Sequence, residues 1–223
     1  MGVVDKVVTL LAAIDGADTD AGQRGASLAE LVSETGMSRA TTHRLASALE
    51  LHGLLRRTID GRFALGPRLM TLGQRAGESW PLADAARPAL IELRDETQES
   101  AQLYTSDYSN DRLGSRVCVM SLESPHGLRT IVSAGSVLPL DQGSGGRVLQ
   151  GEVAPGQGWL ATVAEREQGV ASVSAPVKDR SGTVVAAVSI SGPIDRFGDD
   201  PGARFGDAVV HAADRVARAA GLA

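Results

Sequence analysis

The stretch from Ser27 to Gly53 constrains the fold more than any other part of this chain. Ser27 and Glu30 have the spacing of a capping box, in which each side chain accepts a hydrogen bond from the other residue's backbone N–H at the start of a helix. Gly36 then interrupts the helix, Ser38 is suited to cap a second one, and Gly53 is suited to end it in a left-handed conformation. Two short helices joined by a tight glycine turn predict a helix-turn-helix, whose second helix enters the major groove of DNA.

The second helix has one apolar face. Leu45, Ala46 and Leu49 recur at the spacing with which a helix packs on its own domain. The other faces carry arginine, which pairs with guanine, and threonine, which contacts thymine methyl groups or phosphate. The residues predicted to bind DNA, here and in the hairpin that follows, are Ser27, Ser38, Arg39, Thr41, Thr42, His43, Arg44, Arg57 and Arg62.

A hairpin is predicted directly after this helix. Leu54 to Arg57 and Arg62 to Leu65 are strand-like, and the Asp60-Gly61 pair between them is a strong turn signal. A hairpin in this position is the wing of a winged helix-turn-helix, and its arginines could contact phosphate or the minor groove. The alternative is a small helical domain with a surface hairpin.

The charges of the chain are unevenly distributed. The formal net charge is -5, yet residues 1–75 hold nine Lys and Arg against eight Asp and Glu. Between positions 37 and 68, six arginines face only Glu50 and Asp60. A basic region in an acidic protein indicates a negatively charged partner, although a solvated charged face would give the same pattern.

The rest of the chain predicts a second domain of the α+β class. The 223 residues of the whole chain allow one large domain or two small ones. Helical spacing predicts helices at 3–15, 67–80 and 82–97 and from Phe205 to Ala220. Period-two alternation predicts strands at 101–108, 116–123, 130–133, 171–178 and 183–191, the last two forming a hairpin. We therefore expect a winged helix-turn-helix DNA-binding domain at 1–66, a linker helix at 67–81, and an effector-binding and oligomerisation domain at 82–223.

A glycine-rich segment in the second domain suggests a ligand site. Gly143-Ser-Gly-Gly146 opens a helix, and free N–H groups at a helix N-terminus attract an anion such as a carboxylate. The segment is neither a dinucleotide fingerprint, since position 148 is valine, nor a phosphate-binding P-loop. Serines 172, 174, 189 and 191 could offer hydroxyls to a polar ligand, or could line a half-exposed sheet face of small residues.

Signatures of other protein classes are missing from the sequence. No G-x-S-x-G nucleophile motif occurs, and the four histidines do not cluster at metal-ligand spacing. Cys118 lies within a predicted strand and is expected to be a small core residue. We therefore expect no enzyme activity, no metal and no cofactor. The single cysteine and the lack of a signal peptide or an apolar run of membrane-spanning length favour a cytoplasmic protein.

Three stretches resemble the IclR family of bacterial transcriptional regulators: "SRATTHRLASALELHGLLRRTIDGRFALGPRL", "GSVLPLDQGSGGRVL" and "EREQGVASVSAPVKDRSGTVVAAVSISGP". The resemblance implies a winged helix-turn-helix, a linker helix and an effector-binding domain related to GAF domains. It also implies homodimers or homotetramers on pseudo-palindromic operators in double-stranded DNA. The variant "DETQESAQLY" is similar to the actinobacterial branch that controls leucine biosynthesis and responds to amino acids.

The resemblance also implies where an effector binds. The loop and helix start at 144–146, an acidic residue before the Gly169 strand, and two serines near the end of the last strand match the family's pocket positions. Together with the serine pairs noted above, the predicted effector-binding residues are Ser144, Gly145, Gly146, Glu165, Ser174, Ser189 and Ser191. The family usually has a further helix after this segment, where this chain has only residues 150–158.

We therefore expect a sequence-specific repressor of amino-acid metabolism genes. Its DNA affinity would be set by a small-molecule effector, either an amino acid or a short carboxylate, bound in the C-terminal domain. The alternative is a ligand-independent DNA-binding protein whose C-terminal domain only oligomerises. An enzyme that uses the C-terminal pocket is the other rival, and the lack of a nucleophile–base pair disfavours it.

Overall fold

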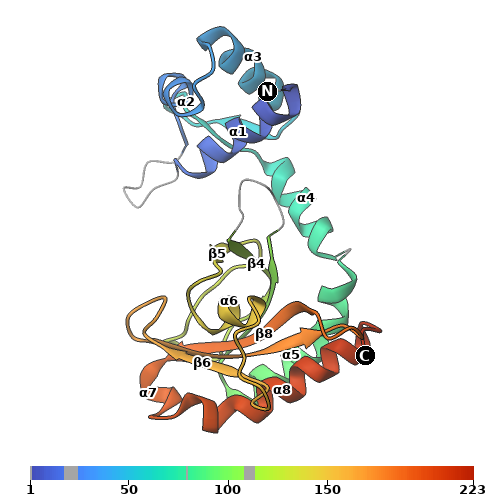
Figure 1. Cartoon of the computed structure of the whole chain (residues 1–223). Helices are drawn as coiled ribbons and strands as arrows, with labels where there is room; N and C mark the ends of the chain where they lie inside the picture. Colours follow the sequence, from blue (N-terminus) through green and yellow to red (C-terminus); the bar gives the residue numbers. More distant parts are fainter. Residues whose placement is uncertain (1, 18–24, 79, 108–113) are drawn as a thin grey trace. The chain divides into compact units, whose positions relative to one another are not determined.

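The computed structural model describes residues 2–17, 25–78, 80–107 and 114–223. These residues form two compact units, Met1–Ala76 and Gly77–Ala223, each with its own hydrophobic core. Figure 1 shows the first unit in blue and cyan and the second from green to red.

The first unit contains three helices and a two-stranded sheet. Leu10 and Ile14 of the first helix, Leu31 of the second and Leu49 of the third meet Phe63 of the sheet in one core. The elements are α1 (Val3–Asp15), α2 (Leu28–Thr35), α3 (Arg39–Leu51), β1 (Leu55–Arg57) and β2 (Phe63–Leu65). The predicted helix at 3–15 and the helix-turn-helix are confirmed.

The helix ends form as their sequences predict. Ser27 N–H donates to the Glu30 carboxylate at 2.7 Å, and Glu30 N–H donates to the Ser27 hydroxyl at 3.3 Å. Ser38 caps α3 by accepting from Thr41 N–H at 3.3 Å. Gly36 has φ +64° and Gly53 has φ +71°, a region that glycine enters without steric cost. The turn between α2 and α3 is thus fixed by local chemistry at both ends.

The wing is an antiparallel hairpin, with Leu55 opposite Leu65 and Arg57 opposite Phe63. Phe63 also exchanges two backbone hydrogen bonds of 2.8 Å with Ala26, just before α2. This bridge ties the wing to the start of the helix-turn-helix.

Helix α4 (Pro67–Glu78) follows the wing and confirms the helix predicted at 67–80. Leu69 and Gly77 are half-buried, and the rest of the helix from Pro67 to Ala76 is exposed. The division into domains at 1–66, 67–81 and 82–223 stays a prediction.

The second unit is built on one antiparallel sheet in the order β5-β4-β3-β8-β7-β6. Helices α5 and α8 cover one face, and the short helix α6 lies over the other (Figure 1). The strands are β3 (Ser100–Ser106), β4 (Ser115–Leu122), β5 (Val137–Pro139), β6 (Leu160–Val163), β7 (Val170–Lys178) and β8 (Val184–Pro193). The helices are α5 (Pro81–Thr97), α6 (Ser144–Leu149), α7 (Ile194–Phe197) and α8 (Pro201–Ala219). The predicted α+β class is confirmed.

The strands alternate between the two faces. Leu103 of β3, Val173 of β7 and Val188 of β8 are fully buried in the core under α5 and α8. Their sequence neighbours point to the face under α6, because successive side chains of a strand alternate. That second face is lined mainly by polar residues.

One predicted strand is wrong, and two were missed. Residues 130–133 show the expected alternation, since Thr130 and Val132 are buried and Ile131 is exposed, but they pair with no described strand. Strand β5 lies a few residues later, and β6 is too short to be recognised by alternation. The predicted strand 101–108 ends at Ser106, and Tyr108 lies outside the described residues.

Candidate functional site

Helix α3 presents an unpaired basic surface at its N-terminal half. Arg39, His43 and Arg44 are exposed, and their side chains form no hydrogen bond or ion pair with another residue in the described part of the chain. Arg39 and His43 line a shallow groove with Arg57 of the wing. Thr41 is half-buried, and its hydroxyl accepts from the Ser38 hydroxyl at 2.9 Å. The side chains of Arg39, His43 and Arg44 are thus free to contact a ligand.

Thr42 lies on the opposite side of α3. Its side chain is fully buried, and its hydroxyl donates to the Ser38 carbonyl at 3.1 Å. This position leaves Thr42 no surface to offer a base or a phosphate, so we drop it from the predicted DNA-binding set.

Two other predicted residues hold the first unit together. Arg62 donates to the Gly25 carbonyl at 2.9 Å and to the Glu30 carboxylate at 2.6 Å, and only 17% of its side chain is exposed. Ser27 is occupied by its capping box with Glu30. Arg62 therefore joins the wing to the start of α2, and Ser27 caps that helix.

Arg57 combines an anchored and an exposed part. Its guanidinium lies 3.6 Å from the centre of the Phe63 ring and donates to the Gly61 carbonyl at 2.8 Å. A 3.3 Å ion pair joins it to Glu50, and 37% of the side chain remains exposed. A phosphate that approached the wing would compete with Glu50 for this group.

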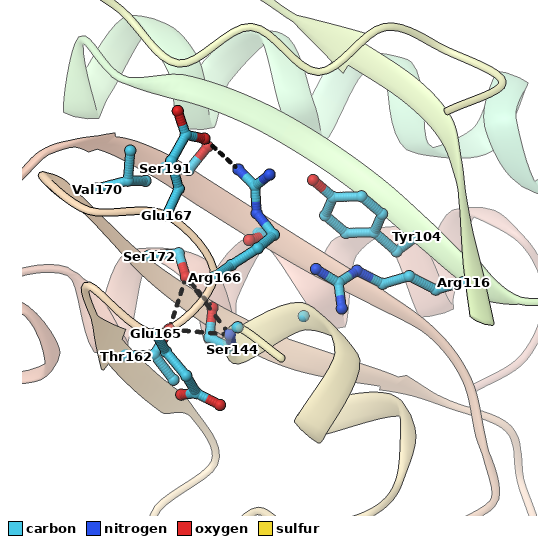
Figure 2. Close-up of a pocket in the computed structure, with 13 residues that line it drawn as sticks. Tyr104, Arg116, Ser144, Thr162, Glu165, Arg166, Glu167, Val170, Ser172 and Ser191 are labelled. Atoms are coloured by element: carbon cyan, nitrogen blue, oxygen red, sulfur yellow. Dashed lines mark hydrogen bonds and ion pairs between the residues drawn. The ribbon is translucent and has the colours of Figure 1, made fainter. Parts of the chain in front are cut away.

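The second candidate site lies on the polar face of the sheet in the second unit. Its cavity is narrow, since the centre of a water-sized sphere can move through only about 20 Å³ of it. Neighbouring strands bring polar side chains to this face, since Ser172 pairs with Ser191 and with Thr162, and Ser174 with Ser189. Figure 2 shows this pocket.

A chain of hydroxyl hydrogen bonds forms the floor of the pocket, and Figure 2 shows the part of it at Ser144, Thr162 and Ser172. The Ser144 hydroxyl lies 2.7 Å from the hydroxyls of both Ser172 and Ser174, and Ser174 donates to Ser189 at 2.8 Å. Ser144 N–H donates to the Thr162 hydroxyl at 3.0 Å. The first N–H group of α6, which was expected to be open to an anion, is therefore already bonded.

The two glycines of α6 allow close packing. A Cβ on Gly146 would overlap the Leu140 carbonyl and the Arg116 guanidinium, and one on Gly145 would lie 3.0 Å from the Tyr104 ring. The predicted residues Gly145, Ser144, Ser189 and Glu165 all line the pocket, as does Ser191, whose hydroxyl donates to the Gln102 amide oxygen at 3.3 Å. Gly146 and Ser174 contact its wall from behind.

Arg116 and Tyr104 line the pocket and were not predicted. Arg116 is 3% exposed, and its guanidinium lies 5.1 Å from the centre of the Tyr104 ring. Burial lowers the pKa of Arg116 and raises that of Tyr104, so the phenol stays protonated. An arginine within an alternating strand, followed directly by Val117 and Cys118, was the available sequence signal.

Charged side chains surround the mouth of the pocket. Arg147 forms a 2.7 Å ion pair with Glu152 and a 3.5 Å contact with Glu165. Arg166 and Glu167 form a 3.4 Å pair in the β6–β7 connection (Figure 2). Each glutamate at the mouth thus has an arginine partner.

The residues that the structure describes contain no group of three or more His, Cys, Asp and Glu side chains placed to hold a metal ion. None of their helices is both long and apolar enough to cross a membrane.

Two family models match the chain. The IclR helix-turn-helix domain covers residues 3–58, and the bacterial transcriptional regulator IclR C-terminal domain covers residues 152–218. The first match contains α1 to α3, and the second contains β6 to most of α8.

Several known proteins are similar to this chain over most of its length. The chain is 30% identical over 205 residues to the HTH-type transcriptional regulator KipR of Bacillus subtilis, covering 78% of this chain and 81% of that protein. It is 24% identical over 230 residues to the transcriptional repressor IclR of Escherichia coli, covering 87% and 83%. A solved IclR homologue from Microbacterium hydrocarbonoxydans, in complex with 4-hydroxybenzoate, superimposes with a TM-score of 0.74 at 19% identity, over the full length of both chains.

Proposed function

The chain belongs to the IclR family of bacterial transcriptional regulators, and we propose that it represses its target genes by placing α3 in the major groove of an operator. The exposed, unpaired side chains of Arg39, His43 and Arg44 carry this proposal. They lie at the N-terminal half of a helix whose start is fixed by the Ser38 cap. Arginine pairs with guanine O6 and N7, and the flanking Arg57 supplies a phosphate contact from the wing.

We further propose that two or four copies of the chain act together. Two α3 helices would read half-sites about 34 Å apart, or a multiple of that spacing, on a pseudo-palindromic operator. The relation of the second unit to GAF domains and its role in oligomerisation belong to this proposal, as does action in the cytoplasm.

The pocket of the second unit is proposed to bind the effector. An effector that prefers one arrangement of the oligomer changes operator affinity, and DNA then changes effector affinity by the same factor. Support comes from the polar lining of the pocket and its hydroxyl floor. The homologue crystallised with 4-hydroxybenzoate suggests one probe for it.

The DNA proposal is tested by Arg39→Ala. We expect the variant to bind selected operator DNA more weakly by about 1–3 kcal/mol, with relaxed preference at one base position. The operator is first selected from a random DNA library with the wild-type protein, and affinity is then measured by fluorescence anisotropy at fixed salt. Arg218→Ala, an exposed change in α8, is the charge-matched control. Equal binding by wild type and Arg39→Ala would remove Arg39 from the interface.

The effector proposal is tested by thermal unfolding of the full chain. The panel contains amino acids, short carboxylates and 4-hydroxybenzoate. A ligand present at about 100 times its dissociation constant stabilises the folded state by about 2.7 kcal/mol. A compound that shifts the midpoint is then added to the DNA titration, where it should change operator affinity. If no compound does so, the alternative of a ligand-independent regulator is favoured.

Regulation of amino-acid metabolism is the narrowest part of the proposal. It rests on the resemblance of residues 95–104 to the amino-acid-responsive branch. A midpoint shift with leucine, together with a leucine-dependent change in operator affinity, would support it.

A further inference from the structure

Arg116 is a buried cation without a carboxylate partner in the described part of the chain. Its side chain is 3% exposed, and it forms none of the ion pairs found among those residues. One terminal nitrogen, Nη1, donates to the Pro139 carbonyl and to the Gln142 carbonyl, the latter at 2.7 Å. These bonds anchor the loop that leads into α6, and they account for one edge of the guanidinium.

The other edge of the guanidinium is unused. The Nε atom is buried without a hydrogen-bond partner, and Nη2 bonds no described residue. Nε and Nη2 lie on the same side of the planar group and form the fork that binds a carboxylate through two parallel hydrogen bonds. A purely structural role for Arg116 explains the Nη1 contacts but leaves this fork unexplained.

The ion pairs around the pocket also single out Arg116. Arg166 is paired with Glu167, and Arg147 is paired with Glu152 and Glu165. Arg116 forms none of these pairs and is the most deeply buried of the three arginines. A buried cation is stabilised when it is paired and hydrogen-bonded.

We propose that Arg116 is the anion receptor of the effector pocket, and that its Nε–Nη2 edge binds the carboxylate of a small acid that carries no ammonium group. The inference rests on the proposed effector role of this pocket. The rest of the ligand would meet the hydroxyls of Ser172, Ser189 and Ser191, which suit a hydroxyl or oxo group.

The exclusion of an ammonium group follows from the acids near the site. In an α-amino acid the ammonium group lies close to the carboxylate, so it would stand beside Arg116 in the buried part of the pocket. The two glutamates that line the pocket, Glu165 and Glu167, are exposed at its mouth and are already paired. An ammonium group would therefore place a second buried positive charge directly beside that of Arg116, and like charges at such short range disfavour each other.

The test compares acids with their amides on the full-length protein. Glycolate, L-lactate and benzoate are titrated beside glycolamide, lactamide and benzamide, and beside glycine, alanine and leucine, at constant ionic strength. We expect at least one acid to raise the thermal midpoint and to bind in calorimetry, while its amide and the amino acids do not. Equal effects of an acid and its amide, a stronger effect of an amino acid, or no effect of any acid would overturn the inference.

Variants then test whether Arg116 supplies the positive charge that binds the acid. Arg116→Lys keeps the charge but loses the planar fork, so we expect the affinity for the bound acid to fall roughly tenfold or more. Arg180→Gln removes one positive charge from the exposed β7–β8 turn, which does not line the pocket, and should change affinity far less. A folded Arg116→Lys variant that binds the acid like wild type would overturn the assignment. If Arg116→Lys does not fold, the comparison of acids with amides on wild type decides.

Failure of this inference can be told apart from failure of the proposed function. An amino acid that shifts both the midpoint and operator affinity would keep the regulator and remove the role of Arg116. A protein that selects no operator DNA would remove the regulator, whatever binds in the pocket.

Discussion

Arg57 and Arg62 stand close together in the wing, yet they have different tasks. Arg62 is largely buried between the Gly25 carbonyl and Glu30, whereas Arg57 keeps an exposed face above Phe63. Sequence alone could not separate them, because both are arginines on one hairpin. The partner of each is set by how the hairpin packs, since Arg62 meets Glu30 of α2 and Arg57 meets Glu50 of α3.

We expect Arg62→Ala to destabilise the first unit by about 1–2 kcal/mol, since it removes charge-assisted hydrogen bonds from a mostly buried side chain. Arg57→Ala should instead weaken DNA binding and flatten its salt dependence, because it removes a phosphate contact. Chemical denaturation and operator titrations at several salt concentrations measure the two effects. The reverse pattern would contradict this division of roles.

Glu30 gives the first unit a pH dependence. Hydrogen bonds from the Ser27 backbone and from Arg62 hold the pKa of this carboxyl below its usual value of 4.5. A carboxyl with a lowered folded-state pKa stabilises the fold above its unfolded pKa, and this contribution is lost as the pH falls through the folded value. We expect the thermal unfolding midpoint of the first unit to decrease as the pH drops below about 4.5. This decrease with pH should be less steep for Glu30→Gln. Identical slopes would show that the capping box is not the cause.

At the scale of elements, Trp159 connects the segment before β6 to α8. Its indole ring packs against Gly202 and Gly206, where a Cβ on either glycine would overlap it. Two glycines four residues apart lie on one face of a helix and leave a notch there. This contact ties the end of the short connection between α6 and β6 to α8.

Gly206→Ala should lower the free energy of unfolding by about 1–3 kcal/mol, because the methyl group displaces the indole from a close-packed contact. Tryptophan emission should shift to longer wavelength as Trp159 moves toward water. Gly73→Ala in α4 is the matched control, since its Cβ would meet nothing within 4 Å. The control should be neutral or slightly stabilising, by up to about 1 kcal/mol. A Gly206→Ala variant that matches the control would show that the notch is adaptable.

The elements that could be predicted are those with strong local signals. Capping residues and helical spacing located α1, α2, α3 and α8, since these signals act within a few residues. The strand predicted at 130–133 is wrong because alternating burial also occurs in a segment that packs on a sheet without pairing with its strands. Strands β5 and β6 depend on partners far along the sequence, and three or four residues hold too little alternation to reveal them.

At the scale of the molecule, the two units have separate cores. We therefore expect two unfolding transitions, with a pocket ligand raising only the midpoint of the second unit and operator DNA only that of the first. Calorimetry of the full chain measures both, and Arg62→Ala identifies the transition of the first unit. A single transition that both ligands shift equally would show that the units unfold together.

The candidate sites were predictable to different degrees. The exposed residues of α3 follow from a local amphipathic pattern, so Arg39, His43 and Arg44 could be found without a structure. Arg116 could not, because its surroundings come from Tyr104 of β3 and from the carbonyls of Pro139 and Gln142, which lie far from it in the sequence. A missing partner is visible only when all neighbours are in place.

The hydroxyl chain of Ser144, Ser172, Ser174 and Ser189 gives the pocket an adaptable polarity. Each hydroxyl has one proton that rotates freely among its neighbours and can either donate or accept. The chain can therefore reverse its direction without moving a heavy atom, and present donors to one ligand and acceptors to another. Such a floor hardly distinguishes ligands by hydrogen bonding alone. Discrimination is left to the charged groups beside it, which cannot be reversed, and above all to the buried positive charge of Arg116.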